Sequence, residues 1–470
     1  RPKSTEVFWI PAELSPAEED RFLDAYRRAR PDRITDLEAL ASGKLKAPRT
    51  SFFFGLVAFD RHFQGLERYV AVRLEALTVT QREILRYLAI AYHYGQQSLP
   101  AQTFAELLGI PRSRRIDLAA SLESPTTVSP VVGELVLELA DGDWRPVHSA
   151  IAEELVVQLI GGQLPRDLWR QNLSAWAVKF AEFVRGSDPV PGDSMKELAY
   201  RVFIYRDNVE LLGTERSAQK EFSQLIGDVP EPSGRISVLR RLSELFSAEA
   251  HIHAHLGRFL GQEGHYKDAI QAIDLALEIE PDDAVVHHIR GMVYRYEAVD
   301  RIAAREPIEA VVASARIATE SFERSRELRP DNEHGFISEV QLLIRVLDYA
   351  ERAAGGAFGS GDPFVRDAIG RAEDLLDQVR ALRVGERLSR YEEECRARLD
   401  VLYGDHSRAL QTFDSLLSRS DVSKPGVRRQ IVWTLLNRRG GKWSSVPKKD
   451  VERSSRLLEE NLIEDSSDAS

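Results

Sequence analysis

The chain contains very little sulfur. Of its 470 residues one, Cys395, is a cysteine and two are methionines. A single cysteine excludes an intrachain disulfide framework and the cysteine-rich ligand sets of structural zinc sites. The sequence therefore predicts a protein that is held together by apolar cores, in keeping with a reducing, cytoplasmic setting.

Long apolar runs and an excess of positive charge are also missing. The longest apolar stretch, SPVVGELVLELADG (residues 129–142), is broken by Glu134 and Glu138 and is too short to cross a bilayer. Lysine and arginine number 63 against 74 acidic residues, a formal net charge of -11. A phosphate backbone would be repelled by such a chain, so we expect neither a membrane protein nor a general nucleic-acid binder.

A phosphate-binding loop is missing as well. The stretch RRGGKWSS comes nearest, but Trp443 follows Lys442 where Ser or Thr would hold magnesium, and Leu436 stands at the upstream glycine position. The chain therefore cannot build the usual ATP site alone, and no catalytic residue is predicted.

The first segment is predicted to contain one strand and several small helices. Residues 6–10, EVFWI, read as a buried strand, and Ser15 with Glu18 forms a capping-box pattern at the start of a helix. In residues 52–77 Phe59 and Phe63 recur with other apolar residues at helical spacing, which predicts one amphipathic helix.

The next segment has the order of a winged helix. Helices are expected at residues 78–95, 99–111 (ended by Gly109) and 112–122, followed by a hairpin in which Leu135, Leu137 and Leu139 alternate before an Asp141–Gly142 turn. The basic run Arg112, Arg114 and Arg115 would begin the third helix, where a DNA-reading member has its recognition helix. DNA binding is possible there, but the acidic chain and the early Asp117 favour an intramolecular role.

From residue 149 the pattern is helical, and an internal repeat is visible. The small, large and helix-ending positions of a 34-residue tetratricopeptide repeat are occupied by Leu256, Gly257, Ala269, Ile273, Ala276 and Pro281. The pattern recurs at Gly291, Tyr294, Ala318, Phe322 and Pro330, stretched by an insertion at residues 299–308, and more weakly at Ala397, Ala409, Phe413 and Leu416. After Arg439 the chain reads as a polar, frayed tail.

Together these patterns predict a mainly α protein: a helical bundle and winged-helix domain followed by an α-α superhelix of tetratricopeptide-like repeats. The expected segments are a first small domain, the winged helix, helical linker repeats, the repeat domain and the tail, at residues 1–75, 76–160, 161–249, 250–440 and 441–470.

Histidines are the first candidate site residues. His148, in WRPVHSAIAEEL, falls between the hairpin and a helix, where an imidazole and free N–H groups could meet an anion; a helix cap is the alternative from the residues alone. His251 and His255 have the i, i+4 spacing that can bind zinc, but no third ligand is indicated and packing explains them better. No metal site is predicted.

The repeats supply the second set of candidates. A repeat superhelix presents its first helices on a concave face. Counting from Leu256 and Gly257 assigns His251, Arg258, Gln262, His288, Met292 and Arg295 to that face. The mixture of charged, polar and apolar side chains suits a protein or peptide partner, with a merely solvated face as the alternative.

The order of these domains resembles the C-terminal portion of STAND-class signal-transduction P-loop NTPases. The stretches FFFGLVAFDRHFQGLERYV, WRPVHSAIAEEL and AHLGRFL are most similar to bacterial STAND proteins with tetratricopeptide sensors and to the related sterile-alpha-motif antiviral proteins of animals. The resemblance implies that residues 6–10 end a nucleotide-binding sheet whose phosphate loop lies upstream. It also implies that a longer parent binds ADP or ATP with magnesium and carries a separate N-terminal effector.

In that family a Met-His-Asp histidine of the winged helix contacts the ADP phosphate and holds the resting state, and His148 matches it by position, although Val147 and Ser149 replace its neighbours. The resemblance further implies a protein trigger on the repeats, such as a phage-encoded protein, and homo-oligomerisation in the active state. Two alternatives stay open: a STAND-type transcription regulator whose winged helix binds DNA, and a plain repeat scaffold.

Overall fold

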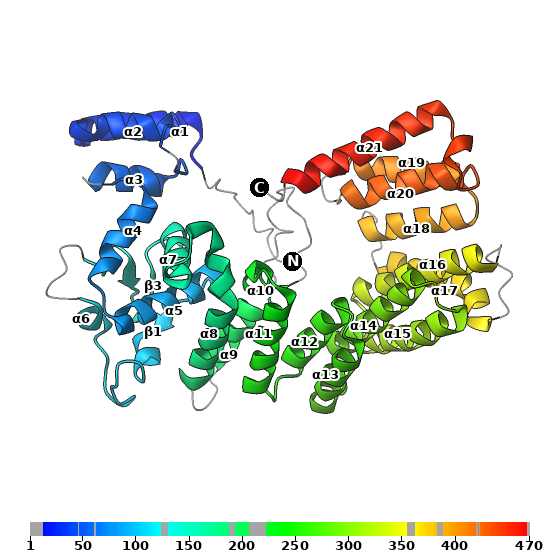
Figure 1. Cartoon of the computed structure of the whole chain (residues 1–470), viewed down its shortest axis with the longest axis horizontal. Helices are drawn as coiled ribbons and strands as arrows, with labels where there is room; N and C mark the ends of the chain where they lie inside the picture. Colours follow the sequence, from blue (N-terminus) through cyan, green and yellow to red (C-terminus); the bar gives the residue numbers. More distant parts are fainter. Residues whose placement is uncertain are drawn as a thin grey trace. The chain divides into compact units, whose positions relative to one another are not determined.

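The computed structural model describes residues 13–45, 47–60, 63–123, 130–187, 193–205, 222–354, 362–382, 389–419, 422 and 424–467. The strand predicted at residues 6–10 lies outside these residues. The described chain contains 21 α-helices and one three-stranded sheet (Figure 1). It divides into two compact units, Arg1–Val202 and Phe203–Ser470.

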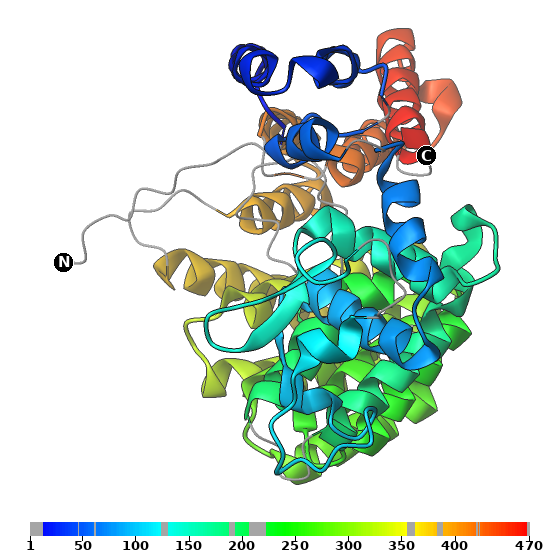
Figure 2. The ribbon, with the colours of Figure 1, turned by 90° about the vertical axis from the view of Figure 1, so that its left-hand side faces the viewer.

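Three short helices begin the first unit: α1 (Pro16–Ala29), α2 (Ile34–Ala41) and α3 (Ser51–Phe59). The predicted capping box is present, because the backbone N–H and the hydroxyl of Ser15 both donate to the Glu18 carboxylate, at 2.8 and 2.6 Å. The three helices, dark to medium blue in Figures 1 and 2, enclose a small core. Its buried members are Leu37, Leu40, Phe53, Phe54, Val57 and Ala58.

The single helix predicted for residues 52–77 is wrong. The structure has α3, which ends at Phe59, and α4 (Leu66–Glu75), which starts after Gly65. Gly65 has a φ of 108°, a conformation that side chains oppose, and it turns the chain between the two helices. Arg33 donates to the carbonyl oxygens of Val57 and Asp60 and so caps the end of α3.

The winged-helix prediction is confirmed. Helix α5 (Val79–Gly95) is followed by β1 (Leu99–Pro100), α6 (Leu118–Leu122), β2 (Val136–Glu138) and β3 (Asp143–Pro146). The strands pair antiparallel in the order β1-β3-β2, with Trp144 opposite both Leu99 and Glu138. Gly142, at a φ of 87°, forms the predicted turn. The buried side of the sheet is completed by Trp144, which is 2% exposed.

Three details of that prediction are wrong. The expected second helix is a 3-10 turn, η2 (Ala101–Phe104), followed by further turns. The third helix begins at Leu118, capped by the Asp117 carboxylate, so the Arg112–Arg115 run lies in the preceding loop. Leu135 is buried as expected, but Leu137 and Leu139 are half-buried and Val136 takes the core position, because β2 starts at Val136.

The first unit is completed by helices that pack on α5. They are α7 (Ser149–Gly161), the 3-10 helix η3 (Arg166–Asn172), α8 (Leu173–Ser187) and α9 (Asp193–Phe203). Glu154 of α7, only 3% exposed, accepts two hydrogen bonds of 2.6 Å from the guanidinium of Arg166. This bidentate pair fixes η3 against α7.

The second unit is a stack of antiparallel helix pairs, which confirms the α-α repeat architecture. Two helices come first, α10 (Gln224–Asp228) and α11 (Pro232–Leu245). The pairs that follow are α12 (Ala250–Gln262) with α13 (Tyr266–Ile279), α14 (Ala284–Ala303) with α15 (Ile308–Leu328), α16 (Glu333–Ala354) with α17 (Pro363–Leu382), α18 (Arg390–Leu402) with α19 (His406–Leu417), and α20 (Lys424–Asn437) with α21 (Lys448–Ser467).

The glycines of the repeat pattern mark the closest approaches. A Cβ on Gly257 would lie 2.6 Å from Ile273 Cγ1, and one on Gly291 would lie 2.5 Å from Phe322 Cε1. Only glycine allows these helices to come so near. The insertion expected at residues 299–308 is mainly helical: α14 continues to Ala303 and α15 starts at Ile308, so this pair is longer than the first.

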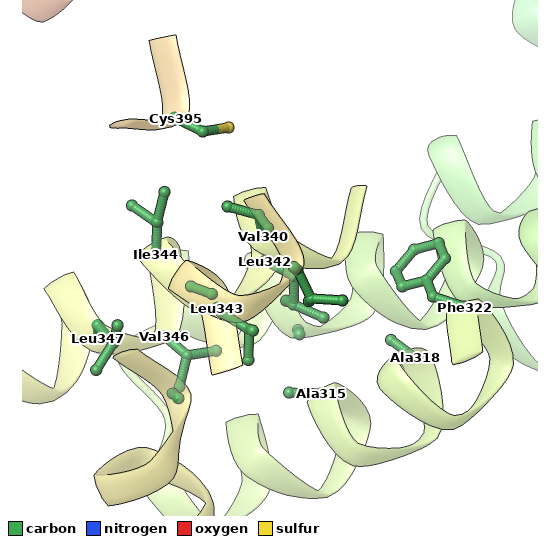
Figure 3. Close-up of a cluster of buried hydrophobic side chains, with 14 of the residues drawn as sticks. Ala315, Ala318, Phe322, Val340, Leu342, Leu343, Ile344, Val346, Leu347 and Cys395 are labelled. Atoms are coloured by element: carbon green, nitrogen blue, oxygen red, sulfur yellow. The ribbon is translucent and has the colours of Figure 1, made fainter. Parts of the chain in front are cut away.

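The pair α16 and α17 was not resolved as a repeat from the sequence. Its apolar side chains join those of α15 and α18 in one large cluster (Figure 3). Figure 3 shows Ala315 and Phe322 of α15, Val340 and Leu343 of α16, and Cys395 of α18, which is 1% exposed. A continuous core thus runs from the second repeat into the fourth.

The prediction of a frayed tail is wrong. Residues 448–467 form α21, which packs on α20 and buries Leu457 and Ser454. Arg428 of α20 is 7% exposed, and its guanidinium reaches Asn461, Glu460 and Glu464 at 3.1, 3.0 and 2.8 Å. These polar contacts fix α21, whose residues are mostly polar or charged, against α20.

Packing of the pairs sets the curvature of the array. The first helices α12, α14, α16 and α18 each contact the next, more extensively than the second helices contact one another. The first helices therefore line the inner side of the curve, the side to which the candidate partner residues were assigned from the sequence. No helix among the described residues has the length and apolar character that a membrane crossing requires.

Candidate functional site

His148 lies at the start of α7, directly after β3. Its Nδ1 accepts a hydrogen bond of 3.1 Å from the backbone N–H of Ala150, so the side chain caps the helix. The imidazole stacks on the ring of Phe52 with centroids 3.9 Å apart and planes 2° from parallel. Burial and the nearby positive charge of Arg145 lower its pKa. The residue therefore has the capping role that the sequence left as an alternative.

The cap determines the tautomer of His148. A ring nitrogen that accepts a hydrogen bond carries no proton, so in neutral His148 the proton is on Nε2. The lowered pKa favours this neutral form at pH 7. The side chain thus caps α7 through one nitrogen and offers an N–H donor through the other, beside the positive end of the helix.

His251 is tied to the start of the next repeat. Its Nε2 lies 3.0 Å from Asp283 Oδ2, while Asp283 Oδ1 accepts from the backbone N–H groups of Val285 and Val286 and caps α14. Burial opposes ionisation of Asp283, but the hydrogen bonds from His251 and from the α14 backbone keep its pKa below the usual value. An oxygen of Glu280 is also close, and these three ligand atoms lie within 4.8 Å of one another.

That trio could hold a metal ion only by giving up existing bonds, because both Asp283 oxygens are already used. His255, the other member of the i, i+4 pair, is not part of the trio. The arrangement is better explained as a joint between α12 and α14, so no metal site is assigned.

The remaining predicted residues divide between two places. His288 packs into the helix interface, its ring 5.5 Å from that of Phe322 and 6.4 Å from that of His334. Gln262, by contrast, lies near the other end of α12 and donates a hydrogen bond of 3.1 Å to the hydroxyl of Tyr296 on α14. His288 thus packs against the rings of Phe322 and His334, whereas Gln262 links α12 to α14.

The three further candidates lie on the first helices α12 and α14. Met292 and Arg295 are half-buried neighbours on α14, with Arg295 Nη1 3.8 Å from the Met292 sulfur. Arg258 of α12 lies with its guanidinium 5.8 Å from the ring centroid of Phe222, a cation–π contact within this unit.

Two arginines that the sequence analysis did not select join Arg295. They are Arg345 of α16 and Arg398 of α18, whose charges are close enough to act on Arg295. Arg398 follows Ala397 as Arg258 follows Gly257, so the repeat register could have identified it. Arg345 lies in the pair α16 and α17, where no repeat was recognised and no register was available.

The basic run of the winged helix is placed differently from the expectation. The guanidinium of Arg112 donates to the carbonyl oxygen of Gly186 at the end of α8, and the loop is fixed by Gln102, which donates to the carbonyl oxygens of Arg112 and Arg114. Arg114 and Arg115 are exposed on this loop. The following helix, α6, has five residues, too few to present a long row of side chains to a DNA groove.

No protein-family profile matches the chain, and no curated protein sequence does either. Among solved structures, a monomeric mutant of IFIT1 with Gppp-AAAA is similar over 83% of this chain and 87% of that one, at 10% sequence identity and a TM-score of 0.36. A similarity at this level supports no inference about function.

Proposed function

We propose that this chain is the regulatory and sensor part of a STAND-class NTPase in prokaryotic antiviral defence. In this proposal the winged helix helps to hold an ADP-bound resting state, and the repeats recognise a protein trigger. Trigger binding would favour exchange of ADP for ATP, homo-oligomerisation and activation of an effector elsewhere in the parent protein, in the cytoplasm. The two states would be biased by a ligand that has a different affinity for each.

The observation that carries the proposal is the geometry of His148. Its capped Nδ1 leaves a protonated Nε2 beside the N-terminus of α7, and both the N–H and the helix end favour a phosphate oxygen. The stacking on Phe52 limits rotation of the ring. A neutral donor held in this way could contact ADP, the role that a STAND-class winged helix would need.

A second observation favours a sensor over a DNA reader. The repeat fold presents stacked helices of the kind that commonly mediate protein interactions. In the winged helix, the arginines expected on a recognition helix are instead on a loop, and the carbonyl of Gly186 engages Arg112. The transcription-regulator alternative would need these arginines on a helix that enters the groove.

The test separates the cap from the phosphate contact. In the parent protein that includes the nucleotide-binding domain, native mass spectrometry after purification without added nucleotide should detect bound ADP. His148→Ser keeps an N-cap but has no group that reaches beyond it, so the fold should persist while ADP is lost. His148→Ala should lose both the ADP and stability of the first unit.

Each outcome of this test separates the STAND sensor from one of its alternatives. Retention of ADP in His148→Ser would overturn the phosphate role of His148. A parent without any bound nucleotide would favour the scaffold alternative. Salt-sensitive binding of duplex DNA that disappears when Arg114 and Arg115 are replaced by glutamine would favour the transcription regulator.

A further inference from the structure

Three arginines on successive first helices of the repeats are close enough for their charges to act on one another. Arg295, Arg345 and Arg398 come from the successive first helices α14, α16 and α18. Within the part of the chain that the structure describes, none of the three forms an ion pair. Their placement contrasts with that of Arg326, Arg371 and Arg396, which all pair with buried glutamates on the same helices or next to them.

The cluster is electrostatically unbalanced. Burial, together with the charges of Arg345 and Arg398, lowers the pKa of Arg295 to about 10. Partial desolvation and the charge of Arg398 also lower the pKa of Arg345. A lowered pKa means that the protonated form is disfavoured, so the folded protein holds these charges at a cost that an arriving anion would relieve.

Few acidic groups offset this charge. Asp348 and Glu394 are the carboxylates whose charges act most on Arg345. Asp348 is paired with Arg352 at 2.6 Å, whereas Glu394 forms no ion pair with a described residue. The three arginines outnumber these two carboxylates, although the chain as a whole has a net charge of -11.

The surroundings favour a protein ligand over a nucleic acid. Met292 lies beside Arg295, and the guanidinium of Arg352, two turns beyond Arg345 on α16, lies 5.2 Å from the ring centroid of Trp433 on α20. Trp433 is 48% exposed. Exposed tryptophan near arginine is typical of protein interaction hot spots, whereas a nucleic-acid backbone needs a longer basic stripe and would be repelled by the acidic remainder of the chain.

We propose that Arg295, Arg345 and Arg398 form a binding site for the carboxylates of an acidic segment in the protein partner, with Trp433 contacting an apolar side chain of the same segment. The inference rests on the proposed function only in that the repeats bind a protein. Guanidinium groups from three helices can each donate in a fork to a carboxylate, so the site selects closely spaced Asp or Glu side chains. It requires no nucleotide.

The experiment uses the full chain and a defined probe. A fluorescein-labelled peptide with four glutamates flanking one leucine is titrated by fluorescence anisotropy against the chain, with the Gln-for-Glu peptide and a labelled oligothymidylate of equal charge in parallel. We expect binding of the acidic peptide that weakens with salt, and at least tenfold weaker binding of the other two.

Four variants, one of them a matched control, locate the site. Arg345→Gln and Arg398→Gln should each weaken the peptide about tenfold or more, the worth of a charged hydrogen bond. The matched control Arg366→Gln removes one charge from the exposed side of α17 and should change affinity less than twofold. Glu394→Gln removes the unpaired competing carboxylate and should tighten binding, a gain that a merely structural role would not produce.

Specific results would overturn the proposal. The proposal fails if the acidic peptide does not bind, if Arg366→Gln and Arg345→Gln weaken its binding equally, or if Glu394→Gln weakens it. Tighter binding of the oligothymidylate than of the acidic peptide would assign the cluster to nucleic acid instead. Because the assay contains no nucleotide, it can fail while the ADP test at His148 succeeds, and it can succeed while that test fails.

Discussion

The contact between Gly291 and Phe322 gives the sharpest test of the repeat packing. A Cβ at Gly291 would lie 2.5, 2.6 and 2.9 Å from three atoms of the Phe322 ring, and this ring is fully buried. Real Cβ atoms do not approach so closely, so in Gly291→Ala either the ring or helix α14 must move. Overpacking of this kind costs about 1–3 kcal/mol.

The matched control is Gly370→Ala in α17. Gly370 is also inside a helix, but a Cβ there would meet nothing within 4 Å. Both variants gain the helix propensity of alanine over glycine, about 1 kcal/mol, so this term cancels in the comparison. The difference between the two variants is therefore the clash alone, about 1–3 kcal/mol.

Thermal unfolding and amide hydrogen exchange provide the assay. At about 2–4 °C per kcal/mol, Gly370→Ala should raise Tm slightly and Gly291→Ala should unfold several degrees below it. Protection loss should concentrate in α14 and α15. In the Gly291→Ala background, Phe322→Leu should cost less than it does in the wild type, because the smaller side chain makes room for the new methyl group. Equal stability of the two alanine variants would refute the close approach.

Three further predictions concern ion pairs, the last helix and pH. Glu339 is fully buried between Arg326 and Arg371, so Glu339→Gln should lower the free energy of unfolding by about 3–5 kcal/mol. Arg371 is half-exposed, so Arg371→Gln should lower it by less; urea unfolding measures both. Deletion of residues 443–467 should lower amide protection in α20 about 100-fold, because it uncovers a buried apolar face and removes the partners of a buried arginine. The pKa of His148 is lower in the folded protein than its unfolded value of about 6.5, so its contribution to stability is present above that pH and is lost as the pH falls. The Tm of the first unit should therefore drop between about pH 7.5 and 5.5, and His148→Ser should make this drop smaller. An unchanged drop in the variant would contradict the buried neutral imidazole.

Sequence reasoning succeeded where one residue type has one physical explanation. Gly257 and Gly291 were assigned to helix contacts because small residues at repeat spacing have few other uses, and the structure places both against large side chains of the facing helix. The hairpin turn at Gly142 and the capping box at Ser15 follow the same logic. Such local signals do not depend on the rest of the fold.

Sequence reasoning failed where tertiary contacts decide. Helix α21 is charged along most of its length, and its burial depends on Arg428, which lies on a different helix. Residues 52–77 have an unbroken apolar period, and only the positive φ of Gly65 shows the break. The arginine cluster is assembled from α14, α16 and α18, so no local pattern contains it.

The single cysteine gives the repeat array a native reporter. Cys395 is 1% exposed, and burial raises the pKa of its thiol to about 12, so neither solvent nor an alkylating reagent reaches a thiolate in the closed fold. Alkylation by a maleimide therefore requires α18 to separate from α16. The alkylation rate measures how often these two helices separate, and the measurement needs no engineered label. A ligand that bridges these helices should slow the reaction in proportion to its occupancy.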